Sequence, residues 1–128
     1  MPGIDLFGRT IGLLQKSLDM RMQNHQAIAA NIANVDTPEY RAVHLDFESG
    51  LRRALASSVN SGGGSESFAK VEAQVIRKSD PSDIGDHNSV NLDEEMISLA
   101  ENQMLYDAAT QMISKKLAGL RYAISEGK

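Results

Sequence analysis

A seven-residue repeat of apolar residues at both ends of the chain constrains the fold more than any other feature. Near the N-terminus, one heptad position holds Ile4, Ile11, Leu18, His25 and Ile32, and a second holds Phe7, Leu14, Arg21, Ile28 and Val35. A repeat of this period places apolar side chains on one stripe of a helix that winds around a neighbour. Residues 4–35 are therefore predicted to form one amphipathic helix about 45 Å long, at a rise of ~1.5 Å per residue.

The same repeat returns over residues 92–124. One position holds Leu92, Leu99, Tyr106, Ile113 and Leu120, and the other holds Met96, Gln103, Thr110, Leu117 and Ile124. Asn91 is placed to cap this helix, with Glu94 completing a capping box. Carboxylates in the first turn and basic side chains near the end complement the helix dipole. A second long helix is therefore predicted.

Apolar residues beside both stripes make the surface too wide for one partner helix. Ile97, Met104, Ala108 and Met112 widen the second helix in this way, so more than one neighbour is expected. Gln103 and Thr110 interrupt the second stripe. They either face a hydrated seam or fix the register between helices through buried hydrogen bonds.

The middle of the chain has a different character. Proline at position 38 disfavours helix at Thr37, so the first helix is expected to stop there and to leave by an extended segment. The spacing of Phe47, Leu51, Ala54 and Leu55 predicts a short amphipathic helix. Residues 57–67 are predicted to form a flexible loop, and alternation over residues 69–75 predicts a strand that pairs within or between chains. The fold class is mainly α, one domain made of two axial helices (1–36 and 92–128) and a middle segment (37–91).

Composition excludes several function classes. The chain has no cysteine, and its net charge of −4 with scattered basic residues argues against nucleic-acid binding. The three histidines lack metal-ligand spacing, and no phosphate-binding loop or nucleophile elbow is present. We therefore predict no catalytic residue, no metal, no cofactor and no small-molecule substrate. The N-terminal residues do not have the pattern of a cleaved signal peptide.

A short motif follows the first helix: Asn31, Asn34, Thr37, Pro38 and Tyr40. Asn34 is suited to end the helix in the left-handed conformation, and Tyr40 to hold the exit against the helices. The motif resembles the A-N-x-x-T-P-G-Y signature of the bacterial flagellar rod and hook proteins. Glu39 stands where that signature has glycine, which places the local turn geometry in question.

The resemblance covers both terminal thirds and is strongest to the small proximal rod members of that family. Residues 90–96, 100–103 and 114–121 carry it at the C-terminal end. It implies a structural subunit whose two terminal helices pair antiparallel in a coiled-coil-like manner. Such a subunit is exported without a cleaved signal peptide by the flagellar type III apparatus. Such subunits polymerise helically into the periplasm-spanning rod of the basal body, which transmits torque from the membrane ring to the distal rod and hook.

The resemblance also implies partners and residues. The partners are further copies of the chain, other rod proteins, membrane-ring and rod-adaptor proteins at the base, and the export gate. Phe47 and Leu51 fit a family export-gate motif, which residues 7–11 also fit loosely; core anchoring of the short helix is the other interpretation of that pair. The residues expected to pack the assembly helices are Ile11, Leu14, Leu18, Ile28, Ile32, Leu92, Met96, Leu99, Tyr106, Ile113, Leu117, Leu120 and Ile124.

Two alternatives to a proximal rod subunit stay open from the sequence. A rod protein of a neighbouring layer would share every physical feature described above. A cytoplasmic helical export chaperone would explain the heptads and the acidity, but not the motif from Asn34 to Tyr40.

Overall fold

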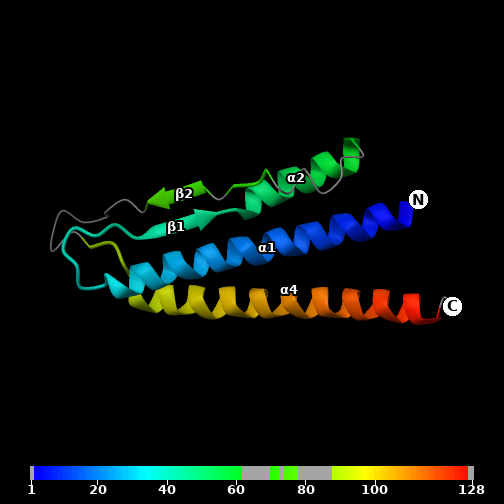
Figure 1. Ribbon diagram of the computed structural model, residues 1–128. Coiled ribbons are helices and arrows are strands. Elements are labelled where there is room, and N and C mark those ends of the chain that lie inside the picture. Colours follow the sequence, from blue (N-terminus) through cyan, green and yellow to red (C-terminus); the bar gives the residue numbers. More distant parts are fainter. Residues whose placement is uncertain (1, 62–69, 73, 78–87, 127–128) are drawn as a thin grey trace.

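Two long helices, α1 (Pro2–Ala33) and α4 (Leu92–Glu126), run antiparallel along the whole molecule. The computed structural model describes residues 2–61, 70–72, 74–77 and 88–126. Figure 1 shows both termini at one end and the turn that follows α1 at the other. The mainly α fold with paired terminal helices is confirmed. No helix in the described part of the chain is both long and apolar enough to span a membrane.

The start of α4 is fixed by Asn91, as predicted. Its Oδ1 accepts hydrogen bonds from the amides of Asp93 at 3.1 Å and Glu94 at 3.3 Å. Its carbonyl also accepts the amide of Glu95. These bonds satisfy amides that have no acceptor inside the helix, and they stabilise its first turn.

The register of α4 on α1 is fixed by Asn102, which is only 3% exposed. Its Nδ2 donates to the carbonyl of Arg21 at 2.9 Å, and its Oδ1 accepts from Nδ2 of Asn24 at 3.1 Å. All of these bonds form in only one register of α4 on α1. A shift of one helix along the other would leave the buried side-chain amide of Asn102 unpaired.

The two polar residues that interrupt the predicted stripe play no part in this contact. Gln103 donates to Asp107 at 3.0 Å and Thr110 donates to the carbonyl of Tyr106 at 2.9 Å, all within α4. Both side chains are exposed. Their role in setting the register inside the subunit is thus ruled out, and Asn102 has that role instead.

A thin second layer covers the side of α1 that faces away from α4. It consists of β1 (Val43–Asp46), α2 (Glu48–Ser61) and β2 (Gln74–Arg77) (Figure 1). Its core cluster joins Met20 of α1 to Phe47, Ala54 and Val71, with Leu13, Leu45 and Leu51 packed around them. A Cβ at Gly50 would lie 3.0 Å from Val71 Cγ1, so this close approach favours glycine.

The short helix is confirmed, but the middle segment differs from the prediction in two places. Residues 57–61, predicted to lie in a loop, belong to α2, where Ser57 Oγ donates to the carbonyl of Arg53; residues 62–69 lie outside the described part. The strand is Gln74–Arg77, not 69–75. It pairs antiparallel with β1 inside the chain, from Val43 opposite Arg77 to Asp46 opposite Gln74. Val71 precedes the strand and packs into the core instead.

Asp46 caps α2, and this predicts an acid-sensitive helix start. Its carboxylate accepts the Ser49 hydroxyl at 2.8 Å and the Ser49 amide at 3.4 Å, and these hydrogen bonds lower the pKa of Asp46. A lowered folded-state pKa means that the cap stabilises above the ordinary pKa of the group, near 3.8, and is lost as pH falls through the lower value. Asp46→Asn keeps a capping oxygen without a titrating group, so its stability should vary less between about pH 5 and pH 2 in denaturant titrations. An equal acid dependence in both proteins would contradict this assignment.

Candidate assembly surfaces

The signature motif closes the turn end of the molecule through Asn31, whose side chain is fully buried at 0% exposed. Its Nδ2 donates to the carbonyl of Val43 at 2.8 Å, and its Oδ1 accepts the amide of Val43 at 2.9 Å. The same oxygen accepts the hydroxyl of Tyr40 at 3.2 Å. Asn31 therefore takes the place of a neighbouring strand for β1, and Tyr40 holds the exit segment against α1.

Asn34 ends α1 by a different route from the one predicted. Glu39 is the only described non-glycine residue with positive φ, so Asn34 does not adopt the left-handed conformation. Its side-chain Nδ2 donates to the carbonyl of Ala30 at 2.7 Å, and its Oδ1 accepts the hydroxyl of Thr37 at 3.0 Å. The side chain satisfies the last turn of the helix, so no left-handed residue is required there.

The chain leaves α1 through a turn and becomes extended only afterwards. This corrects the prediction that an extended segment directly follows the first helix. The amide of Tyr40 donates to the carbonyl of Thr37 at 3.4 Å, with Pro38 and Glu39 between them. Proline in the second place and a φ of 62° in the third are the marks of a type II turn. The extended segment begins only after this turn and leads into β1.

Glu39 occupies the turn position that glycine fills without strain. A residue with a Cβ in the left-handed region costs about 1 kcal/mol relative to glycine. Glu39→Gly should therefore raise the free energy of unfolding by roughly 0.5–1 kcal/mol. Part of this gain is offset because glycine adds conformational entropy to the unfolded chain. Urea unfolding measures this, with Asp36→Gly as the matched control at an exposed position of ordinary φ. A Glu39→Gly protein less stable than the original would show that the turn is not strained.

The residues before α4 complete the same end of the molecule. Nδ2 of Asn88 lies within 2.7–2.9 Å of the carbonyls of Asn34, Val35 and Thr37. The Ser89 amide donates to the carbonyl of Tyr40, and the Ser89 hydroxyl accepts the amide of Ala42. Sequence reasoning missed both residues, because isolated polar residues in a turn-rich stretch carry no periodic signal. They join the two helix ends into one hydrogen-bonded cap.

Phe47 and Leu51, the predicted export-gate pair, lie in the core of the second layer. Phe47 is 2% exposed, and the guanidinium of Arg21 lies 4.7 Å from its ring centre. Arg21 also forms an ion pair with Glu48 at 3.2 Å. In the folded chain, Phe47 and Leu51 therefore anchor the short helix α2 in the core, which was the second interpretation of this pair. A receptor would reach the Phe47 ring only in an unfolded or partly unfolded chain.

The predicted assembly residues divide into two groups. Those toward the other helix of the pair, or toward the second layer, are buried or half-buried: Ile11, Leu14, Leu18, Ile28, Ile32, Leu99, Tyr106 and Ile113. Those left on the outside are between 42% and 66% exposed: Leu92, Met96, Leu117, Leu120 and Ile124.

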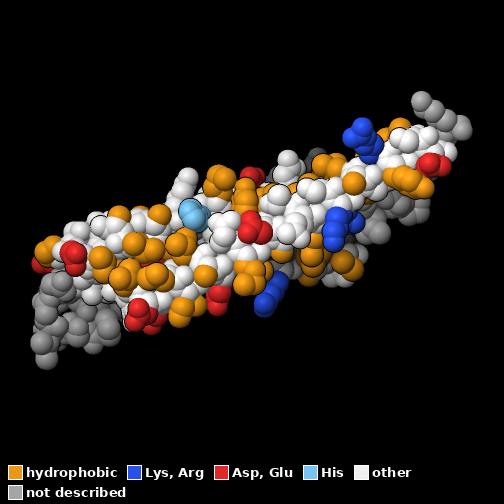
Figure 2. Space-filling model, turned by 90° about the horizontal axis from the view of Figure 1, so that it is seen from below, with side chains coloured by type: hydrophobic (Ala, Val, Ile, Leu, Met, Phe, Trp, Pro, Cys, Tyr) orange, Lys and Arg blue, Asp and Glu red, His pale blue; other side chains and the backbone are white. Residues whose placement is uncertain are grey.

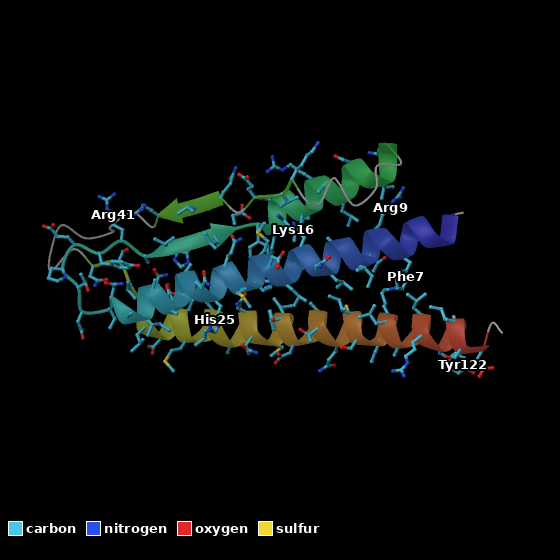
Figure 3. The ribbon with its side chains drawn as sticks, viewed as in Figure 1. Phe7, Arg9, Lys16, His25, Arg41 and Tyr122 are labelled. Carbon is cyan, nitrogen blue, oxygen red and sulfur yellow. The ribbon has the colours of Figure 1, made fainter. Side chains whose placement is uncertain are left out.

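The stripe of buried residues on α4, here called the inner stripe, explains this division. Its buried residues are Glu95, Asn102 and Ala109, one heptad apart and one residue before the predicted second stripe. Ile97, Met104, Leu105, Met112 and Tyr122 are also exposed, which leaves apolar flanks on both sides of the inner stripe. Figure 2 shows apolar side chains spread along this face, and Figure 3 shows Tyr122 near the end of α4 on the side away from α1.

Two hollows accompany these flanks, one on each side of Asn102. The first, of about 310 Å³, lies between α1 and α4 and is lined by Arg21, Met22, His25, Gln26, Asn102, Gln103 and Tyr106. The second, of about 320 Å³, lies between α4 and the start of the second layer, with Phe47, Glu101 and Leu105 among its lining residues. Both are open grooves along helices and suit inserted side chains better than an enclosed small molecule.

Glu95 is the one buried carboxylate in the described residues, at 2% exposed. His44 Nε2 of β1 lies 3.8 Å from its Oε1. The described residues contain no group of three His, Cys, Asp or Glu side chains placed to hold a metal ion. The contact with His44 makes Glu95 a link between β1 and α4.

Comparison with known proteins agrees with the signature motif. No family model matches the chain. The flagellar basal body rod protein FlgB of Salmonella typhimurium is 28% identical, with 97% of this chain and 99% of the relative covered. FlgB of Bacillus subtilis is 28% identical over 98% and 100% of the two chains, and FlgB of Borrelia hermsii is 30% identical over 85% and 90%. The chain therefore belongs to the FlgB family of flagellar basal body rod proteins.

Proposed function

We propose that this chain is a structural subunit of the proximal rod of the bacterial flagellar basal body. The observation that carries the proposal is the near full-length similarity to FlgB proteins, together with the two apolar flanks that α4 leaves exposed. Burial of apolar side chains stabilises an assembly by roughly 25 cal/mol per Å². An exposed surface of this breadth on a helix pair is typical of an assembly site.

The geometry suits a part that transmits torque. The helix pair is held in one register by the Asn102 hydrogen bonds and closed at the turn end by Asn31 and Asn88. Such a unit resists sliding of one helix past the other. We propose that the helix pair forms the inner wall of the rod, that its apolar flanks pack against several neighbours, and that the β1–α2–β2 layer faces outward or bridges subunits.

Export and partners follow from the same assignment. We propose that the chain reaches the periplasm through the flagellar type III apparatus, which recognises Phe47 and Leu51 before they are buried. In the assembled basal body its partners are further copies, other rod proteins, and membrane-ring and adaptor proteins at the base. No catalytic step is part of this function.

A strain lacking the gene tests the proposal. The wild-type gene should restore swimming, and the tagged protein should sediment with purified basal bodies. Leu117→Asp/Ile124→Asp, at exposed positions, should leave the helix content of the subunit unchanged but abolish swimming. Gln111→Asp, an exposed polar position on the same helix, is the matched control and should swim normally. A soluble cytoplasmic protein, absent from basal bodies in a swimming strain, would overturn the assignment.

A further inference from the structure

The strand β2 forms the outer edge of the small sheet. In the described part of the chain that sheet has two strands, and the opposite edge, on β1, lies against α1 (Figure 1). All four residues of β2 are exposed, and among them Val75 is 60% and Ile76 is 51% exposed. An exposed edge strand with apolar side chains is a template on which an extended segment of another chain can pair.

The hydrogen bonds of Asn31 show which backbone groups of β2 face outward. The amide and the carbonyl of Val43 both bond to the Asn31 side chain, so both point away from β2. Val43 lies opposite Arg77, and the two therefore form a non-hydrogen-bonded pair of the antiparallel ladder. Arg77 accordingly turns its own amide and carbonyl away from β1.

The same alternation gives the orientation of the rest of the strand. Val75 lies two residues before Arg77 and also faces outward, whereas Gln74 and Ile76 bond to β1. The outer edge therefore offers two amide donors and two carbonyl acceptors, from Val75 and Arg77. Their side chains share one face of the sheet. A paired segment must place two residues of its own, two positions apart, opposite them.

The charge of this edge indicates the chemistry of the partner. Arg77 is exposed at the end of β2, and Arg41 is exposed near the same end, two residues before the cross-strand partner of Arg77. Figure 3 shows Arg41 beyond this end of β2, pointing away from α1. Within the described residues, neither guanidinium pairs with a carboxylate. We propose that the outer edge of β2 binds an extended segment of a different protein, with an apolar residue opposite Val75 and a carboxylate opposite Arg77.

A second copy of this chain fits the edge less well. The outward-facing residues of its strand are again Val75 and Arg77. Arg77 would therefore oppose either Val75 or another Arg77, and like charges on one face oppose the pairing. The inference deepens the proposed function and rests on it for the place where the partner is met: the β1–α2–β2 layer holds a different protein of the basal body by its strand edge.

A synthetic peptide probes the edge in the full-length protein. The peptide acetyl-Ser-Thr-Val-Thr-Glu-Thr-Ser-amide places valine and glutamate two residues apart, and its control has lysine in place of glutamate. In NMR titrations, the glutamate peptide should shift the backbone amides of β1 and β2 saturably, and the lysine peptide should bind at least about fivefold more weakly. Arg77→Glu should reverse this preference, whereas Arg52→Glu, an equal change of charge on α2, should leave it unaltered. Equal binding of the two peptides to the original protein would overturn the proposal.

Proline variants test which groups face outward. Val75→Pro removes an amide that the sheet does not use, so the protein should keep its melting temperature and bind the glutamate peptide at least about tenfold more weakly. Ile76→Pro removes an amide that bonds to β1, so it should lower the melting temperature. Early melting of Val75→Pro, or undiminished peptide binding by it, would overturn the proposal. Self-association of the original protein that Val75→Pro abolishes would make a second copy the occupant and would overturn it as well.

Swimming separates this inference from the proposed function. In the strain lacking the gene, Val75→Pro and Arg77→Glu should each impair swimming, although both proteins fold as the original does, and Arg52→Glu should swim normally. Normal swimming by Val75→Pro and Arg77→Glu would reject the edge proposal and leave the rod assignment in place. Absence of the original protein from basal bodies would reject the rod assignment, whereas binding of the peptide to the edge in solution would be unaffected.

Discussion

Asn31→Ala should lower the free energy of unfolding of the isolated subunit by about 2–4 kcal/mol. The change removes the partners of both the amide and the carbonyl of Val43, and each partly buried group left unpaired costs roughly 1–3 kcal/mol. It also leaves a small cavity at a fully buried position. Because domains of this size are stable by only about 5–15 kcal/mol, urea unfolding should show a clear shift of the midpoint.

Two further variants separate the hydrogen bonds of Asn31. Tyr40→Phe keeps the ring and loses only the bond to Asn31 Oδ1, so its cost should stay near 1 kcal/mol. Asn31→Asp keeps the shape but replaces the donor to the Val43 carbonyl by an acceptor, so it should be at least as damaging as alanine. Equal stability of Asn31→Ala and Tyr40→Phe would show that the strand contact contributes nothing.

Phe47→Ala should destabilise the subunit by about 3–5 kcal/mol and release the second layer from α1. Phe47 is 2% exposed and joins Met20 of α1 to Val71, so truncation opens a cavity between the layers. Loss of the Arg21 guanidinium contact with the ring adds about 0.5–1 kcal/mol. Hydrogen exchange should show faster exchange over β1 and α2, while the α1–α4 contact near Asn102 stays protected.

Val59→Ala is the matched control, because Val59 lies on α2 and is 73% exposed. Its free energy of unfolding should stay within about 0.5 kcal/mol of the original. A Phe47→Ala protein as stable as this control would contradict the core that unites the two layers.

The sequence predicted the long helices well because their signals are local and periodic. Apolar residues recurring every heptad identify α1 and α4, and the cap at Asn91 follows from the chemistry of one side chain and the amides beside it. The pairing of the two helices is also consistent with this pattern, whereas their antiparallel direction was implied by the resemblance to the rod proteins. What periodicity did not resolve was which apolar stripe faces inward, since α4 is apolar on both flanks. The inner contact is centred on Asn102, a polar residue with no hydrophobic signal.

The middle segment was harder to predict because its elements depend on each other. Gln74–Arg77 is a strand because β1 lies beside it, and its exposed side chains show no alternation of burial. Asn34 was expected to use backbone conformation where its side chain suffices, and Glu39 holds the positive φ. Asn88 and Ser89 belong to the cap only because the fold brings them back to Tyr40 and Thr37.

The central claim is that this chain is a wall-forming subunit of the flagellar rod, and a density map of purified basal bodies tests it most directly. The account predicts paired antiparallel helices of the length of α1 and α4 at the proximal end of the rod, into which this sequence fits with its exposed apolar flanks buried against neighbours. A map in which every proximal subunit is fully occupied by other chains, with no density that fits this one, would contradict it.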